Sequence, residues 1–125
     1  MSHKPTAAEL EILAILWEME KASVRQVHEQ LLEKKETGYT TTLKTMQNMY
    51  IKGLLERNEE KRSHIYMAAK SQQVTQQSLV KNFISKTFGG SAKKLVMQAL
   101  GQSKPSKEEI EEIRTFLDQI ENKSK

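Results

Sequence analysis

Apolar residues recur every three or four positions in three segments near the start of the chain, which is the spacing of one face of an α-helix. The first predicted helix covers residues 7–20 and follows Thr6 and Glu9, which have the spacing of a capping box. The second begins after Ser23, a favourable N-cap residue, and ends near residue 34. Two short amphipathic helices are therefore expected before the loop KKETG.

The third segment is GYTTTLKTMQNMYIKG, residues 38–53. A threonine hydroxyl at or near Thr40 is expected to cap this helix, and Gly53 supplies the left-handed residue that ends it. At about 100° per residue, one side is predicted to pack on the first two helices. That side holds Leu43, Met46 and Tyr50, with Gln47 beside them and Met49 at the edge.

After residue 53 the pattern changes to two short runs, LLERN and SHIYMAA, which contain aromatic and β-branched residues and are separated by the polar EEKR. This pattern is typical of a β-hairpin. Three helices followed by a hairpin is the order of a winged helix-turn-helix domain, which we place at residues 5–70. The expected fold class is therefore mainly α with a small β-hairpin, and a helical segment follows the winged helix.

Residues 71–123 form this second segment, in which three amphipathic helices are predicted. A Gly-Gly pair at 89–90 separates the first two helices, and a turn is expected at residues 101–105. Ser106 and Glu109 give the last helix a capping box. The apolar content of the three helices is too small for an independently stable core.

The apolar stripes of these helices need a surface that covers them. A second copy of the chain is the simplest partner, because most soluble oligomers are two-fold dimers. Folding back onto the first domain as a monomer is the alternative. A helical dimerisation segment is therefore predicted, and its candidate interface residues are Leu79, Phe83, Phe88, Leu95, Ile110, Ile113, Phe116, Leu117 and Ile120.

Composition argues against several classes of function. The chain has no cysteine and its three histidines stand far apart, so neither a metal site nor a cofactor is expected. The serines lack the motif spacing of a nucleophile and the paired glutamates are typical of solvated helices, so an enzyme is not expected. No apolar run approaches the roughly 18 residues that span a bilayer, and no secretory signal is recognisable. We expect a cytoplasmic protein without membrane insertion.

Charge is distributed unevenly along the chain, although the net charge is only +4. Residues 61–107 include basic residues and no acidic ones, and residues 37–55 carry only Lys44 and Lys52. Such a distribution favours an anionic partner. For the part after Lys70, ordinary solvation of helix surfaces by lysine is the alternative.

The side of the third helix opposite the packing residues is polar and has no carboxylate, which favours contact with double-stranded DNA. Its hydroxyl-rich start can also hold a phosphate at the positive end of the helix dipole. A non-enzymatic helical protein-interaction module without DNA binding is the alternative. The predicted DNA contacts are Thr40, Thr41, Lys44, Thr45, Asn48 and Lys52 on the helix, with Lys61 and Arg62 at the hairpin tip.

Several motifs, taken in order, resemble the penicillinase repressor family of BlaI/MecI type. They are TAAELEILAILW, SVRQVHEQL, YTTTLKTMQNMYIKGLLER, RSHIYMAA and KPSKEEIEEIRTFLDQI, which together cover nearly the whole chain. The resemblance implies a homodimeric transcriptional repressor of an inducible operon, with a winged helix on a palindromic operator and a C-terminal helical dimerisation segment. It also adds Thr42, which helical geometry leaves at the flank of the third helix, to the DNA-binding residues.

In this family the repressor leaves its operator after proteolysis of the dimerisation segment, triggered by a membrane receptor that senses β-lactam. The resemblance therefore implies a link to β-lactam resistance and a receptor-linked protease as a further partner. The family's cleavage pair, an asparagine followed by a phenylalanine, is replaced here by Gln98 and Ala99, and the one Asn-Phe pair of the chain is at 82–83. This argues against cleavage at the family position. The copper-responsive relatives need cysteines near the C-terminus, which this chain lacks.

Overall fold

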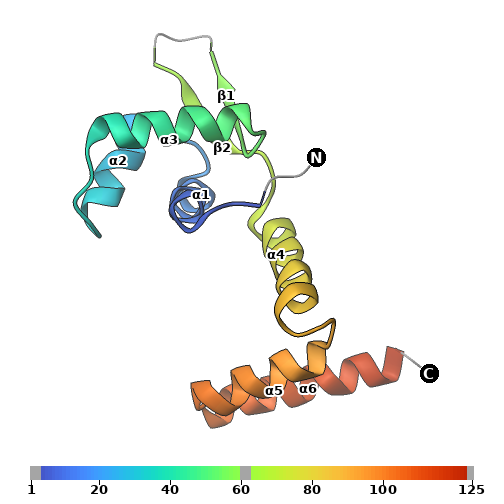
Figure 1. Ribbon diagram of the computed structural model, residues 1–125. Coiled ribbons are helices and arrows are strands. Elements are labelled where there is room, and N and C mark those ends of the chain that lie inside the picture. Colours follow the sequence, from blue (N-terminus) through green and yellow to red (C-terminus); the bar gives the residue numbers. More distant parts are fainter. Residues whose placement is uncertain (1–3, 60–62, 124–125) are drawn as a thin grey trace. The chain divides into compact units, whose positions relative to one another are not determined.

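The structure, a computed structural model, describes residues 4–59 and 63–123 and contains helices with one small antiparallel sheet (Figure 1). This content confirms the predicted fold class, a mainly helical protein with a winged helix and further helices after it. The elements are α1 (Ala7–Met19), α2 (Val24–Leu32), α3 (Tyr39–Ile51), β1 (Leu55–Asn58), β2 (Ile65–Ala68), α4 (Gln72–Thr87), α5 (Ala92–Ser103) and α6 (Lys107–Lys123).

The chain divides into two compact units after Val80, within α4. The first unit contains the three short helices, the hairpin and the start of α4, and the second contains the rest of α4 with α5 and α6. The limits of 5–70 and 71–123 for two domains stay a prediction.

The first two helices begin with reciprocal hydrogen bonds between a hydroxyl residue and the residue three positions later. The backbone N–H of Thr6 donates to Glu9 Oε1 (2.9 Å) and the N–H of Glu9 donates to Thr6 Oγ1 (3.2 Å), which confirms the predicted capping box. Ser23 caps α2 as predicted, and Gln26 completes a second box with bonds of 2.9 and 3.2 Å. Both helix starts therefore satisfy donors that would otherwise lack partners.

The start of α3 differs from the prediction. Its N-cap is Gly38, with an extended backbone (φ −80°, ψ 148°) and no side-chain cap, and the Gly38 carbonyl accepts from the N–H of Thr42 (3.2 Å). Thr40 already belongs to the helix, whereas an N-cap residue must lie outside it, so the expected hydroxyl cap at Thr40 is wrong. The other end is as predicted, because Gly53 follows the helix with a positive φ of 85°.

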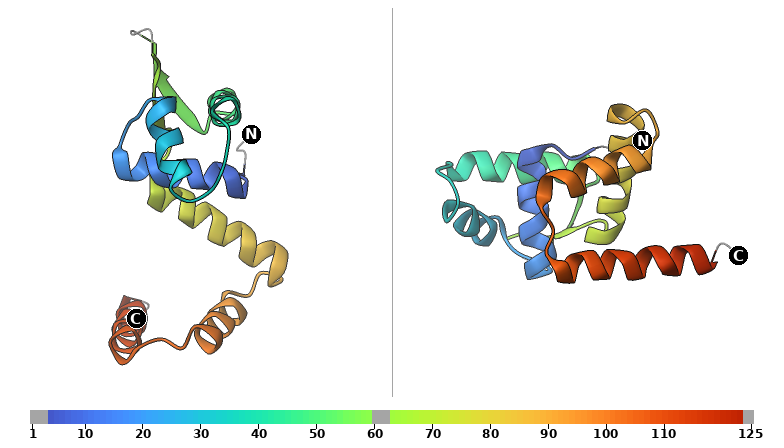
Figure 2. Two further views of the ribbon diagram at one scale, coloured as in Figure 1. Left: turned by 90° about the vertical axis from the view of Figure 1, so that its left-hand side faces the viewer. Right: turned by 90° about the horizontal axis from the view of Figure 1, so that it is seen from below.

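A hydrophobic core lies where α1, α2, α3 and the hairpin meet. Leu16, Val27, Met46, Met49 and Tyr66 are its largest fully buried side chains. The hairpin joins this core through a short bridge, in which the backbones of residues 22 and 66 exchange two hydrogen bonds (3.0 and 2.8 Å). Figure 2 and Figure 1 both show α3 running across α1, with the hairpin extending past α3 on the side away from α1.

The second unit follows the predicted order of helices with one correction. Gly89 and Gly90 have positive φ and end α4 as expected, and Ser106 and Glu109 form the predicted capping box (3.0 and 3.1 Å). The turn expected at residues 101–105 is partly wrong, because α5 continues through its glycine to Ser103. An exposed glycine lowers helix stability by only about 1 kcal/mol, so its presence does not end a helix. The chain turns instead at a left-handed lysine after Ser103.

Gly53, the residue with positive φ after α3, is expected to be needed as glycine. Gly53→Ala should lower the free energy of unfolding of the first unit by about 1–2 kcal/mol, because a Cβ disfavours positive φ. Nothing lies within 4 Å of the added Cβ, so the cost comes from the backbone and not from a clash. Urea unfolding followed by the fluorescence of Trp17, the single tryptophan, measures this cost.

Gly38→Ala, at the opposite end of the same helix, is the matched control. Its φ of −80° suits alanine, and the loss of N-cap preference opposes the lower entropy of the unfolded chain. A change under about 0.5 kcal/mol is expected. Equal effects of the two substitutions would contradict the assigned role of Gly53.

Candidate nucleic-acid interface

The rotation of α3 about its axis decides which residues face solvent. Its buried side chains are Thr42, Met46 and Met49, which follow one another at four and three positions. Leu43 and Tyr50, expected at the centre of the packing side, are only half-buried. The helix is therefore turned relative to the prediction, and Met49 lies in the core and not at its edge.

A contact with the hairpin accompanies this rotation. The Arg57 guanidinium of β1 lies over the Tyr50 ring at 3.9 Å from its centroid, a cation–π distance. Arg57 also pairs with Glu59 at 2.7 Å. Tyr50 is thus held toward the hairpin, and Met49 takes the place next to the first two helices.

The exposed side of α3 is polar apart from Ile51 and carries no carboxylate. The placing of Gln47 beside the packing residues is wrong, because Gln47 is exposed on the same side as Lys44. Ile51 is also exposed there, and neither Gln47 nor Ile51 was expected on this face. The exposed residues of α3 on this side are Thr40, Thr41, Lys44, Gln47, Asn48 and Ile51.

Two of the predicted threonine contacts point their hydroxyls inward or along the helix. Thr42 is 2% exposed, so the expectation that it contacts DNA directly does not fit its position in the core. The Thr45 hydroxyl donates to the Thr41 carbonyl (2.8 Å), and its side chain is half-buried. The predicted hairpin contacts at 61–62 lie outside the described residues.

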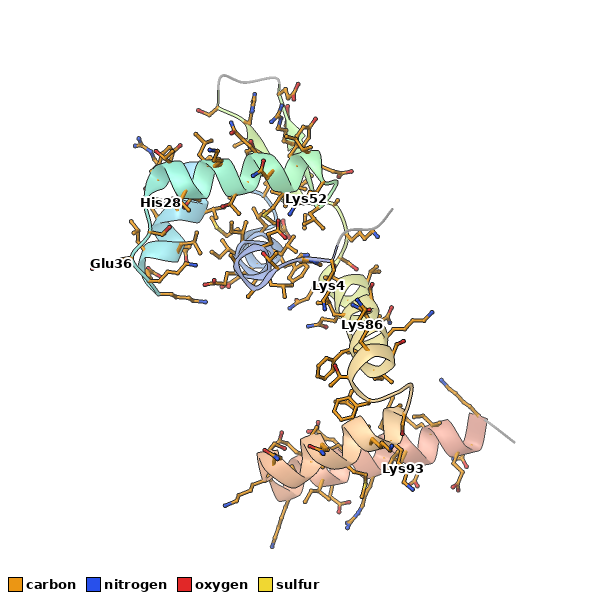
Figure 3. All side chains as sticks on the ribbon, in the orientation of Figure 1. Lys4, His28, Glu36, Lys52, Lys86 and Lys93 are labelled. Atoms are coloured by element: carbon orange, nitrogen blue, oxygen red, sulfur yellow. The ribbon has the colours of Figure 1, made fainter. Side chains whose placement is uncertain are left out.

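A histidine of α2 holds the first turn of α3. The Nδ1 atom of His28 lies 2.9 Å from the Thr42 hydroxyl, and the His28 ring meets the Tyr39 ring edge-on at 5.5 Å between centroids. Figure 3 shows His28 beside the start of α3. No pattern in the sequence indicates this contact of His28. His28 and Thr42 together fix where the amino-terminal end of α3 sits.

A glutamate of α1 holds the last turn of α3. Glu9, 4% exposed, accepts a hydrogen bond from Lys52 Nζ at its Oε2 atom (2.8 Å), while its Oε1 atom accepts from the Thr6 backbone. Burial opposes ionisation of Glu9, but the bonds from Lys52 and Thr6 outweigh it and leave the pKa below the ordinary 4.5. Lys52, predicted to contact DNA, therefore already holds an anionic partner within the protein.

The part of the chain that the structure describes contains no group of three histidine or acidic side chains placed to hold a metal ion. Within the same residues, no helix is long and apolar enough to cross a membrane.

The candidate dimerisation residues leave a large apolar surface uncovered. No residue of α4, α5 or α6 in the described chain is buried, and Phe116 is 60% exposed. The exposed candidates are Phe83, Ile110, Phe116, Leu117 and Ile120. The half-buried candidates are Leu79, Phe88, Leu95 and Ile113. The ring of Phe88 packs edge-on against that of Phe83 at 5.4 Å between centroids.

Comparison with known proteins finds related sequences along nearly the full chain. The model of the family described as Penicillinase repressor matches residues 5–119. The methicillin resistance regulatory protein MecI of Staphylococcus aureus strain N315 is 26% identical over 116 residues, which cover 93% of this chain and 94% of that protein. A protein named Penicillinase repressor, from Staphylococcus aureus, is 24% identical over 116 residues, which cover 93% of this chain and 92% of that protein.

The contact between Glu9 and Lys52 should make the stability of the fold depend on pH. The pKa of Glu9 is lower in the folded protein, so its stabilising contribution is complete above pH 4.5 and is lost as the pH falls through the folded value. Glu9→Gln should lower the free energy of unfolding at pH 7 by about 1.5–3 kcal/mol and flatten its decline in acid. Urea unfolding at a series of pH values from 7 downward measures both effects.

Glu11→Gln on the same helix is the control. Glu11 pairs with Lys35 at 3.0 Å, but both side chains are about 40% exposed, so this change should cost less than about 1 kcal/mol. If Glu9→Gln kept the acid dependence of the unchanged protein, the Glu9 contact would not be the source of the effect.

Proposed function

The chain belongs to the penicillinase repressor family, and from this premise we propose that it is a homodimeric transcriptional repressor that binds a palindromic operator. The observation that carries the proposal is the exposed, carboxylate-free side of α3. A carboxylate on that side would repel phosphate, whereas lysine, asparagine and threonine donate hydrogen bonds to phosphates and base edges.

In this proposal α3 enters the major groove. Lys44 and Asn48 are one turn apart on the exposed side, where they face base edges, a lysine suiting guanine and an asparagine suiting adenine. Thr40 and Thr41 lie in the first turn, where free backbone N–H groups attract a phosphate. Lys61 and Arg62, which the sequence predicts at the hairpin tip, would contact the adjacent backbone.

Three residues of the predicted interface take supporting roles in this proposal. Thr42 acts through the position of α3, because its hydroxyl is held by His28 and it lies in the core. Lys52 contributes less to phosphate binding than Lys44, because the Glu9 carboxylate already offsets its charge. Thr45 stays at the edge of the contact surface, with its hydroxyl bonded to its own helix.

The exposed apolar side chains of α4, α5 and α6 support the proposed dimer. A two-fold dimer would bury them by placing the same surface of each copy against the other. It would also place two α3 helices on successive major grooves, about 34–36 Å or a multiple apart, so that the pair reads a palindrome. Folding back as a monomer is the alternative, and the sedimentation experiment below distinguishes it from the dimer.

The regulated genes are proposed from the relatives alone. Their names refer to methicillin resistance and penicillinase, so we assign this chain a link to β-lactam resistance. Gln98 and Ala99, which replace the family's cleavage pair, lie exposed on α5. A receptor-linked protease would therefore need another sequence to cut.

A salt-titrated gel shift distinguishes this function from that of a protein-interaction module without DNA binding. Duplexes selected from a random library by the full chain serve as the probe. Binding that prefers the selected sequence and weakens steeply between 50 and 200 mM salt, about tenfold or more, is the expected result. A chain that enriches no sequence and shows no salt-dependent shift would be a protein-interaction module.

Loss of either central side chain of α3 should weaken operator binding. Lys44→Ala and Asn48→Ala are each expected to lower affinity for the selected operator about tenfold or more, while sedimentation of the dimer is unchanged. Lys86→Ala, which removes the same charge from an exposed position of α4, is the control. Unchanged affinity in both α3 variants would mean that this side of the helix does not read DNA.

A charge placed on the apolar stripe of α6 should separate the dimer. Phe116→Asp and Ile113→Asp are expected to give monomers by sedimentation and to bind the palindrome poorly, because each would bury an unpaired carboxylate. Thr115→Asp adds the same charge on the other side of α6 and should leave the dimer intact. A monomeric unchanged protein at micromolar concentration would rule out the dimer.

A further inference from the structure

Ile51 is the most exposed large apolar side chain among the described residues, at 78%. It lies in the last turn of α3, on the same side as Lys44 and Gln47, and its neighbours there are polar. A single exposed isoleucine is ordinary on a protein surface, and Leu32 on α2 is another example. Its position, one turn beyond an exposed glutamine on the face proposed to enter the groove, is what sets Ile51 apart.

We propose that Gln47 and Ile51 determine operator specificity by reading neighbouring A·T base pairs in the major groove. The Gln47 amide pairs with the N6 and N7 atoms of an adenine, and Ile51 packs on the 5-methyl group of a thymine. The inference rests on the proposed function, because it assumes that α3 enters the groove. It adds the class of base pair that the second half of α3 recognises.

Helix geometry brings the two side chains within reach of adjacent base pairs. Residues four apart lie on one face of a helix and about 6 Å apart along its axis. One base pair occupies about 3.4 Å of the duplex, so this separation spans about two base pairs. Gln47 and Ile51 are four apart, and both are exposed. In the homeodomain, a helix-turn-helix variant, base contacts also occur beyond the first turn of the recognition helix.

The surroundings of Ile51 favour DNA over an apolar protein partner. An apolar interface would need neighbouring apolar side chains, but Leu43 and Tyr50 are half-buried and Arg57 covers the Tyr50 ring. The exposed residues beside Ile51 are a glutamine, an asparagine and a lysine. No carboxylate occurs between residues 37 and 55, so nothing on this face repels the phosphate backbone. A thymine methyl group is therefore the apolar partner that suits a lone isoleucine in polar surroundings.

The experiment modifies the selected operator one base at a time. Each thymine in turn is changed to deoxyuridine, which removes the 5-methyl group, and each adenine to 7-deazaadenine, which removes the N7 acceptor. Affinities of the full chain are compared with those of Ile51→Ala and Gln47→Ala. Gln73→Ala and Val74→Ala, at exposed positions of α4, are the matched controls.

The affinity of the unchanged protein should fall about fourfold when one particular thymine is replaced by deoxyuridine. This corresponds to about 0.8 kcal/mol for one buried methyl group. Ile51→Ala should bind the unmodified operator correspondingly less well and should not respond to uracil at that position. Gln47→Ala should lose about tenfold on the unmodified operator and become insensitive to one deaza substitution at a neighbouring pair. The two control variants should keep the full response to both modifications.

The outcomes separate this inference from the proposed function. If the unchanged protein binds the operator but either variant responds to every modification as the unchanged protein does, the reading of A·T pairs by these residues is wrong and the repressor function stands. If the unchanged protein enriches no sequence from the random library, the proposed function fails and this inference fails with it.

Discussion

Burial of Met46 and Met49 is the constraint on which the rest of the structure depends. These two side chains are completely covered, and with Thr42 they fix the rotation of α3 against the first two helices. Once that rotation is set, the opposite side of α3 is determined residue by residue, because each side chain lies about 100° from the next. The chemistry offered to a partner is thus a consequence of core packing.

Two polar contacts hold the ends of the same helix. His28 bonds to Thr42 at the start of α3, and Glu9 bonds to Lys52 at its end. Between them, apolar packing fixes the rotation, so α3, a helix of 13 residues, is held at three places along its length. Base recognition requires side chains to be placed within fractions of an ångström, and a helix supported at both ends and along its length meets that requirement.

Local features of the fold could be predicted from the sequence, whereas features set by distant contacts could not. The Thr6–Glu9 box and the stop at Gly53 depend on residues a few positions apart, and the structure confirms both. The Arg57–Tyr50 contact accompanies the observed rotation of α3, and because it joins two separate elements, helical periodicity does not indicate it. Helical periodicity alone puts Gln47 beside the packing residues, where the structure does not have it, although the four-and-three spacing of Thr42, Met46 and Met49 offers a signal for the observed rotation.

Nuclear magnetic resonance of the full chain bound to its selected operator would show whether the exposed side of α3 meets the major groove. We expect intermolecular contacts from the side chains of Lys44, Gln47 and Asn48 to major-groove protons of the bases, with no such contacts from Met46 or Met49. Contacts to DNA confined to α4, α5 and α6, with the α3 side chains unaffected, would contradict the account.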